Sequence, residues 1–224
     1  MAKRPIFSIF DKPQYYQEHL IEFTFFSGFS EQQKRRSIES LHTAWLEKYP
    51  NSKILEISTK SNEPLGKQLS AFNLPIMING KQTTLESAFQ AGKVFTNGGP
   101  YTDLLIVPPY IAKKDLRLRE SGPLIRFVSE NIEFPLEPKT YFYDWLYVNA
   151  INQFDAIADR ICTYDAFTDI EFNPNRSINC QARSAAIYVS LKRNGLLENS
   201  LKSPEVFKET VYFGKKQFEQ LSLF

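Results

Sequence analysis

The pattern of apolar and polar residues begins with two short extended segments. Residues 5–10 (PIFSIF) and 20–26 (LIEFTFF) are rich in β-branched and aromatic residues, which favour strands. Ser30 then predicts the start of a helix, with Gln33 as its capping-box partner. The helix ends before Pro50, and its apolar residues recur at helical spacing: Ile38, Leu41, Trp45, Leu46 and Tyr49.

Extended and helical patterns follow each other in the next segment. Residues 53–58 (KILEIS) predict a strand, and residues 69–78 (LSAFNLPIMI) predict a second extended run that ends at an Asn-Gly turn. Residues 83–95 (TTLESAFQAGKVF) predict a helix in which Thr83 is the N-cap and Glu86 its partner. An Asn-Gly-Gly sequence at 97–99 stops that helix.

The second half of the chain begins with an irregular connection over residues 99–123, a length of loop that often carries function. Residues 132–138 (IEFPLEP) predict a proline-flanked strand, and residues 139–164 are rich in helical pattern. The last clear helix runs from about Asn179 to Asn194 and closes at Gly195.

These elements predict one α+β domain that is rich in helix. Residues 1–50 form an N-terminal extension packed on the core, residues 51–197 form the core, and residues 198–224 form a weakly patterned tail with room for a peripheral helix.

Composition adds little to this picture. Hydrophobic residues make up 42% of the 224 residues and charged residues 23%, as in ordinary soluble domains. The net charge is only +2 and the basic residues are scattered, which is not typical of a protein that holds duplex DNA by itself. We therefore expect contact with a short stretch of nucleic acid or with a partner. The densest basic run, residues 34–36, is interpreted as a solvated helix face.

Several classes of site are disfavoured. Cys162 and Cys180 lack the spacing of a zinc site or a disulfide framework. His19 and His42 form no compelling catalytic triad, and His42 is interpreted as a half-buried helix residue. No phosphate-binding glycine motif follows a strand, so no nucleotide cofactor and no metal is expected. Without a signal-peptide core or a long apolar run, the chain is expected to be cytoplasmic.

Two helices carry polar residues where amphipathic patterning does not require them. Glu86, Phe89, Gln90 and Lys93 share one stripe that either faces solvent or lines a cleft. The alternative for Glu86 is a capping-box role with Thr83. Asp144 and Trp145 lie in an otherwise aromatic and apolar helix, TYFYDWLYVNA, where a carboxylate is either paired or functional.

One block carries a resemblance to a known family. Residues 69–95 combine a Leu-Ser-x-Phe element, an Asn-Gly hairpin and a Glu-x-x-Phe-Gln-x-x-Lys helix start, which resembles the signature block of NADAR proteins. Just upstream, ISTKSNEPLG resembles the family's strand that ends in a Ser-Lys-Ser element. The chain resembles most closely the DarG-type NADAR antitoxins encoded beside DarT-type toxins, over about residues 3–195. That likeness lies in the Lys-Arg-Pro start and in residues 28–42, 98–105, 117–127, 135–147 and 167–184. The tail beyond Leu197 adds nothing to it.

The resemblance implies an activity. DarT-type toxins of this subgroup move ADP-ribose from NAD onto guanine in DNA, and the NADAR partner hydrolyses that linkage. The implied ligands are ADP-ribose and ADP-ribosylated guanine in single-stranded DNA, with the toxin as a further partner and no membrane. Other branches resemble N-glycosidases that act on ribosylamine intermediates of riboflavin synthesis. Both reactions break a C–N bond at a ribose anomeric carbon.

The resemblance also suggests roles for individual residues. Glu86 and Asp144 are the carboxylate candidates for stabilising an oxocarbenium-like transition state and protonating the leaving nitrogen. Lys60 either forms a Schiff base with the ring-opened sugar or positions the ribose hydroxyls. Phe72, Trp145 and Tyr101 are expected to stack on bases or cover the ribose, and Arg119 and Arg183 to hold the pyrophosphate. Further polar contacts are expected from Ser70, Gln90, Lys93, Asp169 and Asn179.

Three hypotheses remain in competition: a DNA-guanine ADP-ribosylglycohydrolase, an N-glycosidase for small ribosylamines, and a non-catalytic protein that binds ADP-ribosylated DNA or the toxin. The N-terminal extension and the GFSEQQKRRS segment favour the first, because they resemble the toxin-linked branch.

Overall fold

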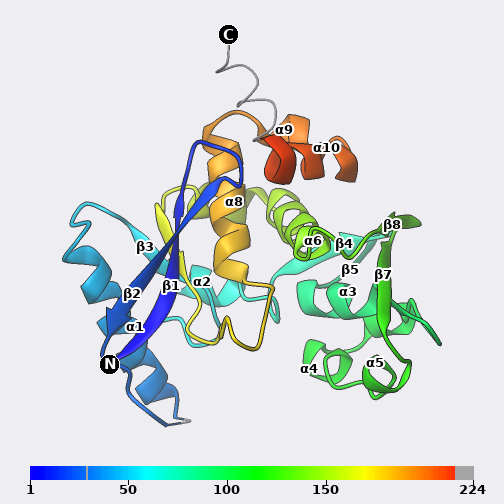
Figure 1. The fold of residues 1–224 in the computed structure, drawn as a ribbon, viewed down its shortest axis with the longest axis horizontal. Helices are drawn as coiled ribbons and strands as arrows, with labels where there is room; N and C mark the ends of the chain where they lie inside the picture. The colour runs from blue at the N-terminus through cyan, green and yellow to red at the C-terminus, as the bar shows by residue number, and fades with distance from the viewer. Residues whose placement is uncertain (29, 215–224) are drawn as a thin grey trace.

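A computed structural model describes residues 1–28 and 30–214. A four-stranded sheet with strand order β2-β1-β9-β3 lies on the left side of the molecule in Figure 1. β1 pairs antiparallel with β2 and β9, whereas β3 pairs with β9 in parallel. With helices packed around this sheet, the fold is α+β, as predicted. The strands are β1 (Ala2–Ile9), β2 (Tyr16–Phe23), β3 (Ile54–Glu56) and β9 (Ala166–Thr168).

The N-terminal segment is joined to the rest of the chain through this sheet. β1 pairs with β9 at Phe7 and Ser8, so backbone hydrogen bonds tie the first strand to a segment near residue 167. Helix α1 (Glu31–Leu46) begins as predicted, because the Ser30 side chain accepts a hydrogen bond from the Gln33 amide (3.3 Å). Its apolar stripe packs against the sheet in one buried cluster: Ile6, Ile21, Phe23, Ile38, Leu41 and Trp45.

The hairpin after residue 69 is shorter than predicted. Residues 69–74 form turns, and only β4 (Pro75–Ile78) is extended. It pairs with β5 (Lys81–Thr84), and Asn79 and Gly80 take the positive φ angles of the predicted Asn-Gly turn.

The predicted helix over 83–95 is also shorter, and its predicted cap is wrong. The helix is α3 (Leu85–Ala91), and Thr84 caps it by accepting from the Ser87 amide (3.3 Å). Thr83 instead donates to the Leu105 carbonyl oxygen (2.7 Å). After α3 the chain passes at Gly92 so close to a neighbour that a Cβ would lie 2.8 Å from the Val128 carbonyl oxygen.

Strand β6 (Lys93–Phe95) follows and opens a three-stranded antiparallel sheet with β7 (Leu124–Ser129) and β8 (Ile132–Phe134). The connection between β6 and β7 was predicted to be irregular, but it contains three short helical segments. They are η1 (Thr102–Ile106), α4 (Pro109–Ala112) and α5 (Arg117–Glu120), and α4 and α5 lie below α3 in Figure 1.

The helices of the second half build most of the core. They are α6 (Tyr141–Asn152), α7 (Asp155–Ile161) and α8 (Gln181–Arg193), close to the predicted positions. α8 runs through the centre of the molecule beside the β1–β2 hairpin (Figure 1). Its residues Ala182, Ala185 and Ala186 are fully buried, because small side chains let neighbouring backbones approach closely.

The tail contributes to the core. It forms α9 (Leu197–Ser200), α10 (Pro204–Lys208) and a π-helical turn (Glu209–Phe213), and Phe207 is fully buried beside Tyr141 of α6. The predicted tail helix is therefore packed on α6, while residues 215–224 of the predicted tail lie outside the described residues. Within residues 1–28 and 30–214, no helix is long and apolar enough to cross a membrane.

Candidate functional site

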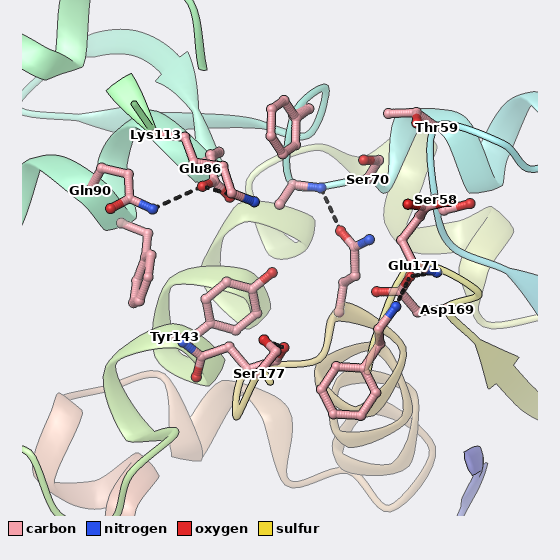
Figure 2. A pocket seen from close by; sticks show the side chains of 16 residues that line it. Ser58, Thr59, Ser70, Glu86, Gln90, Lys113, Tyr143, Asp169, Glu171 and Ser177 are labelled. Atoms are coloured by element: carbon pink, nitrogen blue, oxygen red, sulfur yellow. Dashed lines mark hydrogen bonds and ion pairs between the residues drawn. The ribbon is translucent and has the colours of Figure 1, made fainter. Parts of the chain in front are cut away.

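A cavity of about 560 Å³, here called the first cavity, opens between α3, the turns before β4 and the loop that follows β9 (Figure 2). Its volume lies in the range of small-molecule sites. Segments far apart in the sequence line it: Ser58, Thr59, Ser70, Ala71, Phe72, Glu86, Phe89, Gln90, Lys113, Tyr143, Asp169, Glu171, Phe172, Ser177, Asn179 and Gln181.

Helix α3 supplies a carboxylate wall. Glu86 and Gln90 lie one turn apart, each only 6% exposed, and Gln90 Nε2 donates to Glu86 Oε1 (2.9 Å). Lys113, which directly follows α4, places its Nζ 3.8 Å from the same carboxylate oxygen. Among the described residues, Gln90 Oε1 is buried without a hydrogen-bond partner. The wall therefore presents an anion, a cation and an acceptor that a ligand can satisfy.

Aromatic rings line the cavity next to this wall. Phe89 meets Tyr143 of α6 edge-to-face, with ring centroids 5.3 Å apart. Phe72 is half-buried, and Lys113 Nζ lies 5.0 Å from its ring centroid. Burial raises the pKa of Tyr143 well above its usual value, so its hydroxyl stays protonated. These rings suit a flat base or a ribose face.

Asp169 faces Glu86 across the cavity, from the loop after β9 (Figure 2). Its Oδ1 accepts from the amides of Glu171 (3.0 Å) and Phe172 (3.2 Å). Gln181, at the start of α8, holds two neighbouring segments. Its side chain accepts from the Ala71 amide (2.7 Å) and donates to the Ile57 carbonyl oxygen (3.0 Å).

A buried hydrogen-bond network lies directly behind Asp169. Glu56 of β3 is 2% exposed and accepts from the Thr168 hydroxyl (2.6 Å) and the Ile170 amide (2.9 Å), the residues on either side of Asp169. His42 Nε2 of α1 hydrogen-bonds the same Thr168 hydroxyl (2.9 Å). Burial lowers the pKa of His42 to about 4, so the imidazole is neutral at neutral pH.

The two acidic side chains of the cavity have different surroundings. Burial, together with the charge of Glu56, raises the pKa of Asp169 to about 8. The Asp169 carboxyl group therefore carries its proton at neutral pH, whereas Glu86 has the ammonium group of Lys113 beside it. A carboxylic acid facing a carboxylate across a cavity is an arrangement that acid–base chemistry uses.

Some of the residues suggested by the sequence meet in this cavity and others do not. Those that line it are Ser70, Phe72, Glu86, Gln90, Asp169 and Asn179. Those that do not line it are Lys60, Lys93, Tyr101, Arg119, Asp144, Trp145 and Arg183.

Asp144 and Arg183 form a buried ion pair that joins α6 to α8. Asp144 is fully buried, and each of its oxygens accepts from Arg183 Nη2 (3.1 Å). Ser184 donates to one oxygen and the Tyr212 hydroxyl to the other (2.6 Å). Hydrogen bonds therefore occupy both oxygens of this carboxylate, which joins α6 to α8 and to the tail.

Two lysines lie near the cavity without lining it. Lys60 is half-buried beside Thr59, and its amide donates to the Ser58 hydroxyl (3.1 Å). Lys93 is half-buried with its Nζ 4.9 Å from the Phe89 ring centroid. Burial and the charge of Lys113 lower the pKa of Lys93, and the charge of Glu86 opposes them.

The other suggested residues have structural contacts of their own. Trp145 packs on Phe207, with ring centroids 5.6 Å apart, and so belongs to the core under the tail. The Tyr101 hydroxyl hydrogen-bonds Ser121, and Arg117 lies over the Tyr101 ring. Arg119 is exposed on α5.

Sequence reasoning missed several residues of the site. Lys113, Tyr143, Glu171 and Gln181 line the cavity, and Glu56 supports it from behind. Glu56 carried a signal, since an acidic residue inside the apolar strand KILEIS must be buried or face a site. The others depend on contacts between distant segments, which periodicity does not reveal.

The described residues contain no group of three or more His, Cys, Asp or Glu that could hold a metal ion. Residues 2–220 match a family model described as DarT1-associated NADAR antitoxin. A search of curated proteins finds no match. The family match includes the tail, which sequence resemblance had not covered.

Proposed function

Because the chain belongs to the DarT1-associated NADAR antitoxin family, we propose that it hydrolyses the N-glycosidic bond between ADP-ribose and guanine in DNA. Its family gives it a role in a toxin–antitoxin system with a DarT-type toxin. The proposed activity would reverse the modification that such a toxin makes.

The observation that carries this proposal is the pair of facing carboxyl groups in the first cavity. Breaking a bond at an anomeric carbon builds positive charge on the ribose and negative charge on the leaving nitrogen. Glu86 is a buried carboxylate that can stabilise the positive charge. Asp169, with its pKa raised to about 8, can protonate the leaving nitrogen at neutral pH.

In this scheme the bond between C1′ of the ribose and the guanine nitrogen breaks, and its electron pair goes to the nitrogen. Asp169 gives that nitrogen a proton. The oxygen of a water molecule bonds to C1′ and loses a proton to Glu86. Transfer of that proton to solvent and reprotonation of Asp169 restore the starting state. Asp169 thus takes the role that the sequence had suggested for Asp144.

A lysine amine can replace water as the nucleophile. In the ring-opened sugar, the amine would attack C1′, release the guanine amine and form an imine that water later hydrolyses. Lys60 is the sequence-based candidate. Two further amines are Lys113, whose Nζ lies 3.8 Å from Glu86, and Lys93, whose Nζ lies 4.9 Å from the Phe89 ring centroid. Phe72 and Tyr143 would cover the base or ribose, and the free acceptor of Gln90 would bind a ribose hydroxyl or a base N–H.

The proposal is tested by supplying three substrates to the native protein: single-stranded DNA with ADP-ribosylated guanine, the same DNA with ADP-ribosylated thymine, and a small ribosylamine. Chromatography measures the released sugar. We expect release from the guanine-linked substrate only. Preferential cleavage of the ribosylamine would favour the metabolic N-glycosidase, and tight binding of the modified DNA without release would favour a non-catalytic antitoxin.

A further inference from the structure

A second cavity of about 720 Å³ lies beside the first and has no part in the chemistry above. It is bounded by the β4–β5 hairpin, by η1 and by the start of α4. Its lining combines amide, hydroxyl and apolar groups: Asn73, Pro75, Ile78, Asn79, Lys81, Gln82, Thr83, Thr84, Thr102, Leu105, Ile106, Val107, Pro108 and Pro109.

Three segments border both cavities. Phe72 lines the first cavity, and the next residue, Asn73, lines the second. Thr84 lines the second cavity, and Glu86, two residues later, lines the first. Likewise Pro109, the first residue of α4, lines the second cavity, and Lys113, which directly follows α4, lines the first. The same three segments therefore contribute to both linings, which places the two cavities next to each other along the chain.

The second cavity also differs from the first in charge. Glu86, Asp169 and Glu171 line the first cavity, whereas the lining of the second contains no Asp or Glu and one lysine, Lys81. Lys114 is exposed two residues after the end of α4, whereas Lys113 pairs with Glu86 in the first cavity. An anionic backbone would meet attraction at Lys81 and no carboxylate in the lining itself, while Glu130 lies behind Asn79 and accepts from its amide (2.9 Å).

Exposed apolar side chains accompany these cations. Ile106 is 80% exposed, and Tyr110 and Ile111 on α4 are 57% and 47% exposed. Cationic groups interleaved with exposed apolar and aromatic surfaces are the features by which proteins hold single-stranded nucleic acid, through backbone attraction and base stacking. Amide and hydroxyl groups in the cavity floor suit the polar edges of a base.

We propose that the second cavity binds the nucleotide next to the modified guanine in a single DNA strand. This inference rests on the proposed function for the first cavity. It assigns the second cavity to the unmodified part of the substrate, so that hydrolysis should be faster in an oligonucleotide than in an isolated ADP-ribosylated guanosine monophosphate.

The test compares kcat/KM on these two substrates for Lys81→Glu and Ile106→Ser, both exposed positions of the second cavity. Lys202→Glu and Leu20→Ser are matched controls at exposed positions elsewhere. We expect the native protein and both controls to favour the oligonucleotide by about tenfold or more, the worth of one stacked base. Each second-cavity variant should lose that preference and keep its rate on the monophosphate.

An unchanged oligonucleotide preference in both second-cavity variants would overturn the assignment. Binding of a fluorescent, unmodified 12-nucleotide strand, about the site size of one single-strand-binding module, is measured by anisotropy in parallel. If neither substrate is hydrolysed, the proposed function fails. The anisotropy then tests the second cavity independently, because its variants should bind the unmodified strand more weakly than their controls do. Loss of toxin binding with intact strand binding would show that the second cavity is a protein interface, against the proposal.

Discussion

At the scale of single residues, Glu86 carries the strongest prediction. Glu86→Gln keeps the volume of the side chain and removes its charge, so hydrolysis should fall by about 100-fold or more, the usual scale for an acid–base group. Because Thr84 and not Thr83 caps α3, the change should leave the melting temperature nearly unchanged. ADP-ribose binding should also stay nearly unchanged, because the amide keeps the size of the side chain and an oxygen that can accept from Gln90. Single-turnover rates, thermal denaturation and calorimetry measure the three quantities.

Glu133→Gln is the matched control, since Glu133 is an exposed partner of Arg126 away from the first cavity. A Glu86→Gln protein that melts several degrees lower yet hydrolyses normally would assign Glu86 a structural role.

The raised pKa of Asp169 predicts how the rate of hydrolysis depends on pH. A general acid must be protonated, and the pKa of Asp169 is raised to about 8, so activity should be lost as the pH rises through about 8. Glu56→Gln removes the charge that helps to raise this pKa, so the alkaline limb of the profile should move to lower pH. A profile of kcat/KM between pH 5 and 10, about the range in which such groups titrate, measures the shift.

Glu171→Gln is the comparison for this profile, because Glu171 raises the pKa of Asp169 less than burial and Glu56 do. It should move the limb less than Glu56→Gln. An alkaline limb that does not depend on Glu56 would rule out Asp169 as the group that titrates.

The lysines around the first cavity offer a test that distinguishes water from a lysine amine as the nucleophile. Water is the nucleophile of the main scheme. If an amine replaces it, Lys93 is the residue expected to form the imine, because it combines a lowered pKa with a place beside Phe89. Borohydride added during turnover should then give a protein heavier by one ADP-ribose, and Lys93→Arg should abolish both adduct and activity. Mass spectrometry of the intact protein detects the adduct.

Lys60→Arg and Lys113→Arg are tested in the same way. Loss of the adduct only in Lys60→Arg would restore the sequence-based assignment to Lys60. No adduct with the native protein would leave water as the nucleophile.

At the scale of elements, we expect the buried ion pair between Asp144 and Arg183 to stabilise the packing of α6 on α8. Asp144→Asn leaves Arg183 without its charge partner and should cost about 3–5 kcal/mol of unfolding free energy. Tyr212→Phe removes one donor to the same carboxylate and should cost about 1–3 kcal/mol. Urea denaturation measures both, with Tyr110→Phe as an exposed control.

Hydrolysis by Tyr212→Phe should stay near native at low temperature, where the variant is folded. If Asp144→Asn keeps native stability and loses hydrolysis, the sequence-based view of Asp144 as a catalytic carboxylate is restored.

The elements also show where sequence patterns succeed. The helix after Ser30, the Asn-Gly turn and α8 were predicted well, because caps, turns and long apolar stripes are local signals. The helix over 83–95 was predicted too long, since Val94 and Phe95 continue its apolar pattern. Pairing of β6 with β7 draws these residues into a sheet, and this long-range contact outweighs local helix propensity.

At the scale of the whole molecule, the fold class was predictable and the sheet order was not. β3 and β9 are only three residues long, and they come together through pairing over more than a hundred positions. Some residues of the site were likewise predictable from the sequence and others were not. Glu86 and Gln90 share a helix stripe within the resemblance, whereas Lys113, Tyr143 and Glu56 reach the cavity only through the tertiary fold.

One measurement tests the central claim most directly. A single-stranded oligonucleotide with one ADP-ribosylated guanine is incubated with excess native protein, and the mass of the intact strand is followed over time. The proposed activity predicts that the strand loses one ADP-ribose group, that free ADP-ribose appears at the same rate, and that Glu86→Gln slows both by about 100-fold. A strand that keeps its full mass while bound to the folded native protein would contradict the claim.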